Sequence, residues 1–188
     1  MEFGKVEQLR DEVVGLRPVY GDIGNCTELL LKSGEIVLDK RSLNGVKKAL
    51  AMAYAIDLKA QRRQLQASLK RKGGPFPFYL SRKRVFIPLK MRRVVSDNDA
   101  VYGYLDLDYI DVLELISSRK CIVKLSNALR LEVLSSRQTM LGAQHDGVAV
   151  REFLHKQVEK VDNGISDEQL AAAVRLIIST ITKMVPDS

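Results

Sequence analysis

The spacing of the hydrophobic residues changes at Ser42, and this change is the strongest constraint on the fold. Before it, residues 26–31 and 35–39 flank a turn at 32–34, whose glycine can take positive φ and close a β-hairpin. After it, apolar residues recur every three or four positions, as on one side of a helix: Leu43, Val46, Leu50, Tyr54, Leu58, Leu65 and Leu69. We predict one long helix that is capped by Ser42 and ends at residues 73–75.

Two segments with the composition of strands contain a proline. Residues 13–20 are interrupted by Pro18, and residues 85–91 by Pro88. Because proline has no backbone N–H to offer a neighbouring strand, we expect both segments at sheet edges.

Further strands are predicted after residue 100. Residues 101–115 alternate between apolar and polar side chains, which indicates a half-buried strand with Asp106 and Asp108 on the solvent side. Residues 121–125 and 129–133 also alternate, and the short polar turn between them predicts a second hairpin.

The two ends of the chain have weaker patterns. Residues 1–10 contain too little apolar material to be anchored, and we expect a loose polar helix there. Residues 139–147 are polar and contain glycine, which favours a loop, whereas 148–161 favour a helix. Residues 166–169 form a capping box before a helical stripe that either docks on the core or forms a homodimer contact: Leu170, Val174, Ile177, Ile181 and Met184.

These elements predict an α+β fold: an antiparallel sheet built from hairpins, with one long packed helix and a helical C-terminal extension. The 188 residues are enough for one core and a small appended element. We place the α+β domain at residues 11–147 and the helical extension, with a possible role in oligomerisation, at 148–188.

The sequence favours a cytoplasmic protein without membrane contact. No apolar run approaches the ~20 residues of a transmembrane helix, and the first residues lack the cationic start and apolar centre of a signal peptide. Cys26 and Cys121 lie in apolar segments, so we expect small buried hydrophobic residues and no disulfide.

Positive charge is concentrated in one segment. Residues 59–93 hold 12 Lys or Arg and no Asp or Glu, whereas the rest of the chain holds 18 basic and 23 acidic residues. Clustered cations contact many phosphates at once, so we predict that this segment binds double-stranded DNA. The candidate contacts are Lys59, Arg62, Arg63, Lys70, Arg71, Lys72, Arg82, Lys83, Arg84, Lys90, Arg92 and Arg93.

Other interpretations of the basic segment remain open. Phe76, Phe78, Tyr79 and Phe86 lie among the cations and could stack on the bases of RNA or single strands, although core packing is their more ordinary role. The cations could also only solubilise a helix face, or contact an acidic protein.

Residues for catalysis are scarce. The sequence has no glycine-rich phosphate loop and no metal-spaced Cys or His cluster, and we expect His145 and His155 to be ordinary exposed side chains. On one strand face, Asp106 and Asp108 would lie about 7 Å apart and could share a metal ion with a third carboxylate. A metal-dependent nuclease is therefore the enzymatic alternative, but we expect no enzyme activity and no cofactor.

Several short motifs carry a resemblance to a known family. After the helix that begins at residue 43 come Gly74-Pro-Phe-Pro77, Phe86-Ile-Pro-Leu-Lys90, the segment 102–110 and the hairpin 122–133. In this order they resemble the ComK family of competence transcription factors, over roughly residues 13–147, and the hairpin with its polar loop is similar to LytTR-type DNA-binding domains. The ComK resemblance implies AT-rich duplex sites, minor-groove contacts, oligomers on DNA and transcriptional activation. The chain departs from the pattern at Ala128, where a glycine is expected, and in the helix at 166–185.

Overall fold

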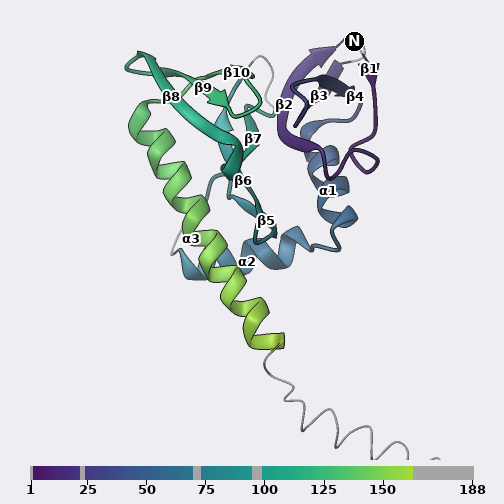
Figure 1. Cartoon of the computed structure of the whole chain (residues 1–188), viewed down its shortest axis with the longest axis vertical. Helices are drawn as coiled ribbons and strands as arrows, with labels where there is room; N and C mark the ends of the chain where they lie inside the picture. Colours follow the sequence, from purple (N-terminus) through teal and green to yellow (C-terminus); the bar gives the residue numbers. More distant parts are fainter. Residues whose placement is uncertain (1, 22–23, 70–72, 95–98, 163–188) are drawn as a thin grey trace, which may run out of the picture. The chain divides into compact units, whose positions relative to one another are not determined.

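A computed structural model describes residues 2–21, 24–69, 73–94 and 99–162 (Figure 1). The backbone divides into two compact units, Met1–Arg151 and Glu152–Ser188. The described part of the first unit contains both β-sheets, two complete helices and the start of a third, and its mixed α+β fold confirms the predicted class.

In the described part of the chain, the strands form two sheets. The larger sheet has the order β1 (Glu2–Phe3), β4 (Ile36–Asp39), β3 (Gly24–Leu31), β2 (Val13–Gly21), β7 (Tyr102–Asp106), β6 (Arg84–Lys90) and β5 (Phe78–Ser81), and the smaller sheet has the order β10 (Arg130–Val133), β9 (Lys120–Leu125) and β8 (Ile110–Ser117). Among the described strands, only β1 and β4 pair in parallel. The two predicted hairpins are confirmed as β3–β4 and β9–β10.

Two hydrophobic cores cover the two faces of the larger sheet. On one face, Leu16 belongs to a cluster with Leu50 of α1 (Leu43–Ala53). On the other, Ile87 belongs to a cluster with Cys121 of β9. Adjacent strand residues enter different cores because side chains alternate between faces, so α1 and the smaller sheet lie on opposite faces. Cys121 and Cys26 are both buried free thiols, as predicted.

The predicted single long helix is wrong, because the chain forms two helices there. α1 ends at Ala53, Ala55 has a positive φ of 56°, and α2 spans Leu58–Ser68. The Asp57 side chain accepts hydrogen bonds from two backbone N–H groups at the start of α2, which is a strong N-terminal cap. Ser42 occupies the cap position of α1 but makes no side-chain cap bond.

Helix α2 covers the outer edge of the larger sheet. The Gln61 side chain donates to the Tyr79 carbonyl at 2.8 Å and accepts from the Tyr79 N–H at 2.9 Å. Tyr79 lies in β5, which is the last strand of the sheet. A buried amide side chain thus replaces a neighbouring strand and satisfies an edge that is otherwise open to pairing.

Both prolines lie in strands that are internal in the sheet, yet each proline has a strand partner on one side alone. Pro18 pairs with Thr27 of β3, while the pairing of β2 with β7 is confined to Gly15 and Leu16. Pro88 pairs with Tyr104 of β7 and lies beyond the pairing of β6 with β5. The edge prediction therefore holds for the local position and fails for the strand as a whole.

Two further predictions are corrected. Residues 101–115 are not one strand, because a short 3-10 turn (Leu107–Tyr109) separates β7 from β8 and sends the chain into the smaller sheet. The N-terminal residues form no helix: β1 pairs with β4, and the N–H of fully buried Val6 donates to Asp39.

Helix α3 spans Arg137–Asp162, so the loop predicted at 139–147 is wrong and the helix predicted at 148–161 is part of a longer one. A Cβ on Gly147 would lie 2.5 Å from the Ile87 side chain, so the glycine permits close packing of α3 on the sheet. The capping box and stripe at 166–185 lie outside the described residues. No helix in the described ranges is long and apolar enough to cross a membrane.

We predict that Ala55→Gly stabilises the protein. A left-handed backbone conformation costs a residue with a Cβ roughly 1–2 kcal/mol, and glycine avoids that cost at a smaller entropic penalty. The free energy of unfolding, measured in urea, should rise by up to about 1 kcal/mol. Ala49→Gly in α1 is the matched control and should lower it by about 1 kcal/mol; a loss at both positions would contradict the left-handed assignment.

A candidate anion-binding pocket

A pocket of about 280 Å³ lies between α1, α2 and the segment that leads into β5. Four cations line it together with two amides and several apolar side chains, and no described residue of the lining is acidic. The lining residues are Asn44, Lys47, Lys48, Leu58, Lys59, Gln61, Arg62, Phe76, Pro77 and Phe78. Two of these cations, Lys59 and Arg62, were predicted from the sequence. Lys47 and Lys48 were not.

Lys47 is the most unusual residue of the pocket. Its ammonium donates a hydrogen bond to the Tyr104 hydroxyl at 2.9 Å. It lies 4.2 Å from the centre of the Tyr104 ring and 4.9 Å from that of Phe78, so two cation–π contacts hold it. Burial, with a smaller contribution from Arg62, lowers the pKa of Lys47 to about 8. Burial also raises the pKa of Tyr104 to about 12.

Arg62 is held in place by the rim of the pocket. Its guanidinium lies 5.2 Å from the centre of the Phe76 ring and donates to the Gly74 carbonyl at 3.3 Å. Such a contact leaves other N–H groups of the fork available, since a guanidinium has five.

The nearest acidic residue in the sequence is occupied elsewhere. Between residues 40 and 93 the sequence has 16 Lys or Arg and one acidic residue, Asp57. The carboxylate of Asp57 caps α2, and its hydrogen bonds from the N–H groups of Ala60 and Lys59 lower the pKa of Asp57. Asp57 therefore stays charged and offsets part of the charge of Lys59, although Asp57 itself does not line the pocket.

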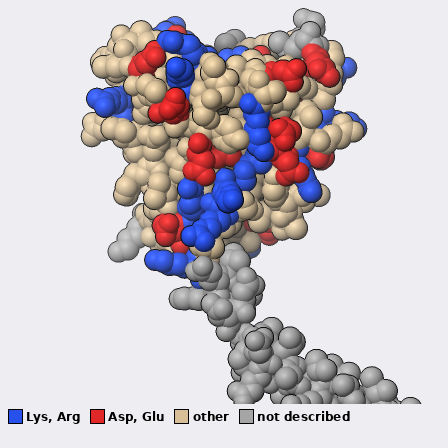
Figure 2. Space-filling model, viewed as in Figure 1, with Lys and Arg blue, Asp and Glu red and all other residues tan. Residues whose placement is uncertain are grey.

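The other predicted cations do not gather around this pocket. Arg63 is exposed on α2. Arg82 and Lys83 are exposed in the turn before β6. Half-buried Lys90 lies at the other end of β6, roughly 20 Å from that turn at 3.3 Å per residue. Lys70, Arg71 and Lys72 lie outside the described residues. The basic segment is thus divided among several places, and Figure 2 shows cations on one face in a band with carboxylates on both sides.

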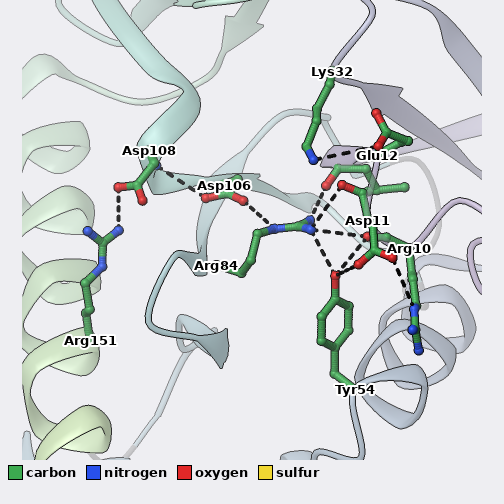
Figure 3. A network of polar contacts seen from close by, with 10 residues as sticks. Arg10, Asp11, Glu12, Lys32, Tyr54, Arg84, Asp106, Asp108 and Arg151 are labelled. Atoms are coloured by element: carbon green, nitrogen blue, oxygen red, sulfur yellow. Dashed lines mark hydrogen bonds and ion pairs between the residues drawn. The ribbon is translucent and has the colours of Figure 1, made fainter.

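Arg84 is an internal structural residue (Figure 3). Its Nε donates to Asp106 at 2.8 Å and one Nη donates to the Tyr54 hydroxyl at 3.0 Å. The other Nη donates to the Val13 carbonyl, and the carbonyls of Arg10 and Asp11 lie within reach. Because all three of its nitrogens donate inside the fold and its side chain is 11% exposed, Arg84 leaves the set of proposed DNA contacts.

Arg92 is mostly buried, whereas Arg93 is exposed. The Arg92 guanidinium lies 4.1 Å from the centre of the Tyr20 ring, donates to Asn25 at 2.9 Å and pairs with Asp99 at 3.2 Å. Its side chain is 12% exposed, so we also remove it from the proposed contacts. Arg93 is exposed and stays in the set.

The carboxylates of the nuclease alternative are engaged in ion pairs. Asp106 is fully buried against Arg84, which corrects the expected solvated strand face, and Asp108 pairs with Arg151. Burial raises the pKa of Asp106 to about 6, although Arg84 acts in the opposite direction. Among the described residues, no group of three possible ligands could hold a metal ion.

The aromatic side chains of the basic segment lie inside the fold. Phe76, Phe78, Tyr79 and Phe86 are all at most 7% exposed, and Phe78 and Phe86 stack with ring centres 5.0 Å apart. They form the wall of the pocket or the core, and none offers an open face to a base.

Comparison of the chain with protein-family models, with curated proteins and with solved structures found no match.

We predict that Arg84→Met strongly destabilises the fold. The substitution leaves the Asp106 carboxylate buried without its partner, which typically costs 3–5 kcal/mol, and the free energy of unfolding should fall by about that much. Arg130→Met is the control, because it breaks an exposed pair with Glu114 and should cost about 1 kcal/mol or less. Equal losses in urea denaturation would show that Arg84 is not the structural residue described above.

The raised pKa of Asp106 predicts a dependence of stability on pH. A carboxyl whose pKa is higher in the folded than in the unfolded state binds more protons when folded, so folding gains from protonation as the pH falls through about 6. Relative to Asp106→Asn, the wild type should become more stable as the pH is lowered from about 7 to about 4. A difference that stays flat over this range would mean that Arg84 keeps the carboxylate charged.

Proposed function

We propose that this chain is a cytoplasmic protein that binds double-stranded DNA through the surface around the pocket. The observation that carries the proposal is the meeting of Lys47, Lys48, Lys59 and Arg62 at one pocket without a described carboxylate. Clustered cations bind phosphates and release the counterions of the nucleic acid.

The burial of the aromatic residues favours duplex over single-stranded nucleic acid. Single strands are held mainly by stacking of bases on exposed aromatic rings, and Phe76 and Tyr79 are buried. Contacts to the phosphate backbone need only cations on the surface. Lys48 and Lys59 are exposed at the pocket, and Arg63 is exposed elsewhere on α2.

The resemblance of the element order to the ComK family extends the proposal to transcriptional regulation in bacteria, with AT-rich sites as the preferred sequence. AT-rich minor grooves are narrow and attract inserted arginines. Arg93, Arg82 and Lys83 are exposed and are the proposed candidates for that contact.

We predict salt-dependent duplex binding that depends on the pocket rim. With about four phosphate contacts, the slope of log K against log salt should be about −3 to −4. Lys48→Gln with Lys59→Gln should reduce its magnitude by about 2 and weaken binding at low salt, measured by fluorescence anisotropy. Arg119→Gln with Arg137→Gln removes the same charge from exposed positions outside the pocket and should change the slope little.

The same titrations separate the alternatives. No duplex binding at low salt, or equal losses in the two double variants, would reject the proposed surface. Tighter binding of single strands than of duplex would favour the single-stranded alternative, and duplex binding no tighter than heparin binding would favour an acidic protein partner.

A further inference from the structure

The pocket contains a half-buried ammonium, that of Lys47, which meets no carboxylate among the described residues of the pocket lining. Lys47 is held by one hydroxyl and two aromatic rings, and no described carboxylate lines the pocket. Removing an ammonium from water is costly unless an opposite charge and hydrogen bonds replace the water. The ammonium also has two further donors beyond the one given to Tyr104.

The remaining cations point to the kind of group that would complete the site. Lys48, Lys59 and Arg62 line the same pocket as Lys47, so a bound group would meet ammonium groups and a planar guanidinium. A phosphate with a double negative charge has three terminal oxygens as acceptors and suits this combination better than a singly charged carboxylate.

The shape of the pocket favours a compact ligand. Its volume of about 280 Å³ is close to the lower end of the range for small-molecule sites, about 300–1,000 Å³. Phe76, Pro77 and Phe78 line the pocket as buried side chains, so binding would depend mainly on the charged group of the ligand. The phosphodiester of an intact duplex has a single negative charge and is attached on two sides, so it contacts the exposed rim more easily than the half-buried amine of Lys47.

We propose that this pocket binds a phosphomonoester, with the phosphate on Lys47, Lys48, Lys59 and Arg62. The source is a small phosphorylated molecule or the 5′-phosphate of a nucleic-acid end. The inference shares its residues with the proposed function but does not require duplex binding.

The charges around Lys47 give the proposal a second observable. Lys48 comes from its own helix, Lys59 and Arg62 from α2, and the Tyr104 hydroxyl from β7. Since these neighbours are cations or a neutral phenol, a bound dianion would be the opposite charge nearest to Lys47 and would raise its pKa above the value of about 8. By linkage, the affinity for the ligand must fall as the pH rises through about 8.

The test uses the full chain and phenyl phosphate as the probe, with phenol and benzoate as controls, in calorimetric titrations. Binding of phenyl phosphate alone is expected, and Lys47→Met should weaken it at least about tenfold by removing a charge-assisted hydrogen bond. Lys120→Met, far along the sequence in β9, should leave affinity unchanged. Lys47→Met should also unfold at the same or a higher temperature than the wild type, because it removes a half-buried charge without an acidic partner in the pocket lining.

Two further arms complete the test. NMR of ε-labelled lysines should show the Lys47 pKa rising on addition of phenyl phosphate, and Lys47→Arg should bind without the pH dependence near 8. Adenosine 5′-monophosphate compared with a short duplex, with and without 5′-phosphates, distinguishes a small ligand from a nucleic-acid end.

The outcomes also separate this inference from the proposed function. Phenyl phosphate binding without duplex binding supports the inference and rejects the function. Duplex binding without phenyl phosphate binding overturns the inference alone, as does binding of benzoate with equal affinity or an unchanged titration of Lys47.

Discussion

The fold depends on the guanidinium of Arg84. From β6 it reaches Asp106 on β7, the Val13 carbonyl at the start of β2 and the hydroxyl of Tyr54 at the end of α1. The two halves of the larger sheet and the first helix therefore meet at one side chain. A buried ion pair of this kind fixes geometry more than it adds net stability, and here it ties the end of α1 to the sheet through the Tyr54 hydroxyl.

The sequence predicts the hairpins well because their signals are local. A glycine with positive φ at residue 34 and Asn127, whose side chain bonds the backbone of Leu129, lie in the turns themselves. The helix break was missed because the apolar spacing continues through Tyr54 and Leu58, although Asp57 before Lys59 is a recognisable cap signal. Gly142 and Gly147 favour a loop in the sequence, yet both lie in α3. Gly147 gives the helix room to pack against Ile87 of β6, which is far away in the sequence.

The site was less accessible from sequence, since charge counting does not distinguish cations by burial. Arg62 and Arg84 look alike in a basic run, but one lines a pocket and the other lies in the core. Lys47 lies between Val46 and Leu50, next to the apolar stripe of its helix, and a lysine there indicates a cation turned towards the interior. That signal was present. Its aromatic partners come from β5 and β7, and no local pattern reveals them.

The pairing of the larger sheet also has a consequence for folding. β1 to β4 come from the first 39 residues and β5 to β7 from residues 78–106, and the two groups join through Gly15 with Leu105 and Leu16 with Tyr104. At this junction a Cβ on Gly103 would lie 2.6 Å from the Leu16 carbonyl oxygen, so the strands can approach only without a side chain there. Each hairpin closes a short loop. The pairing of β2 with β7 closes a loop that contains all residues between Leu16 and Tyr104, so its entropic cost is larger. During synthesis on the ribosome, the N-terminal hairpin and α1 can therefore form first. The edge of β2 that pairs with β7 is expected to stay unpaired until Tyr104 has left the ribosome.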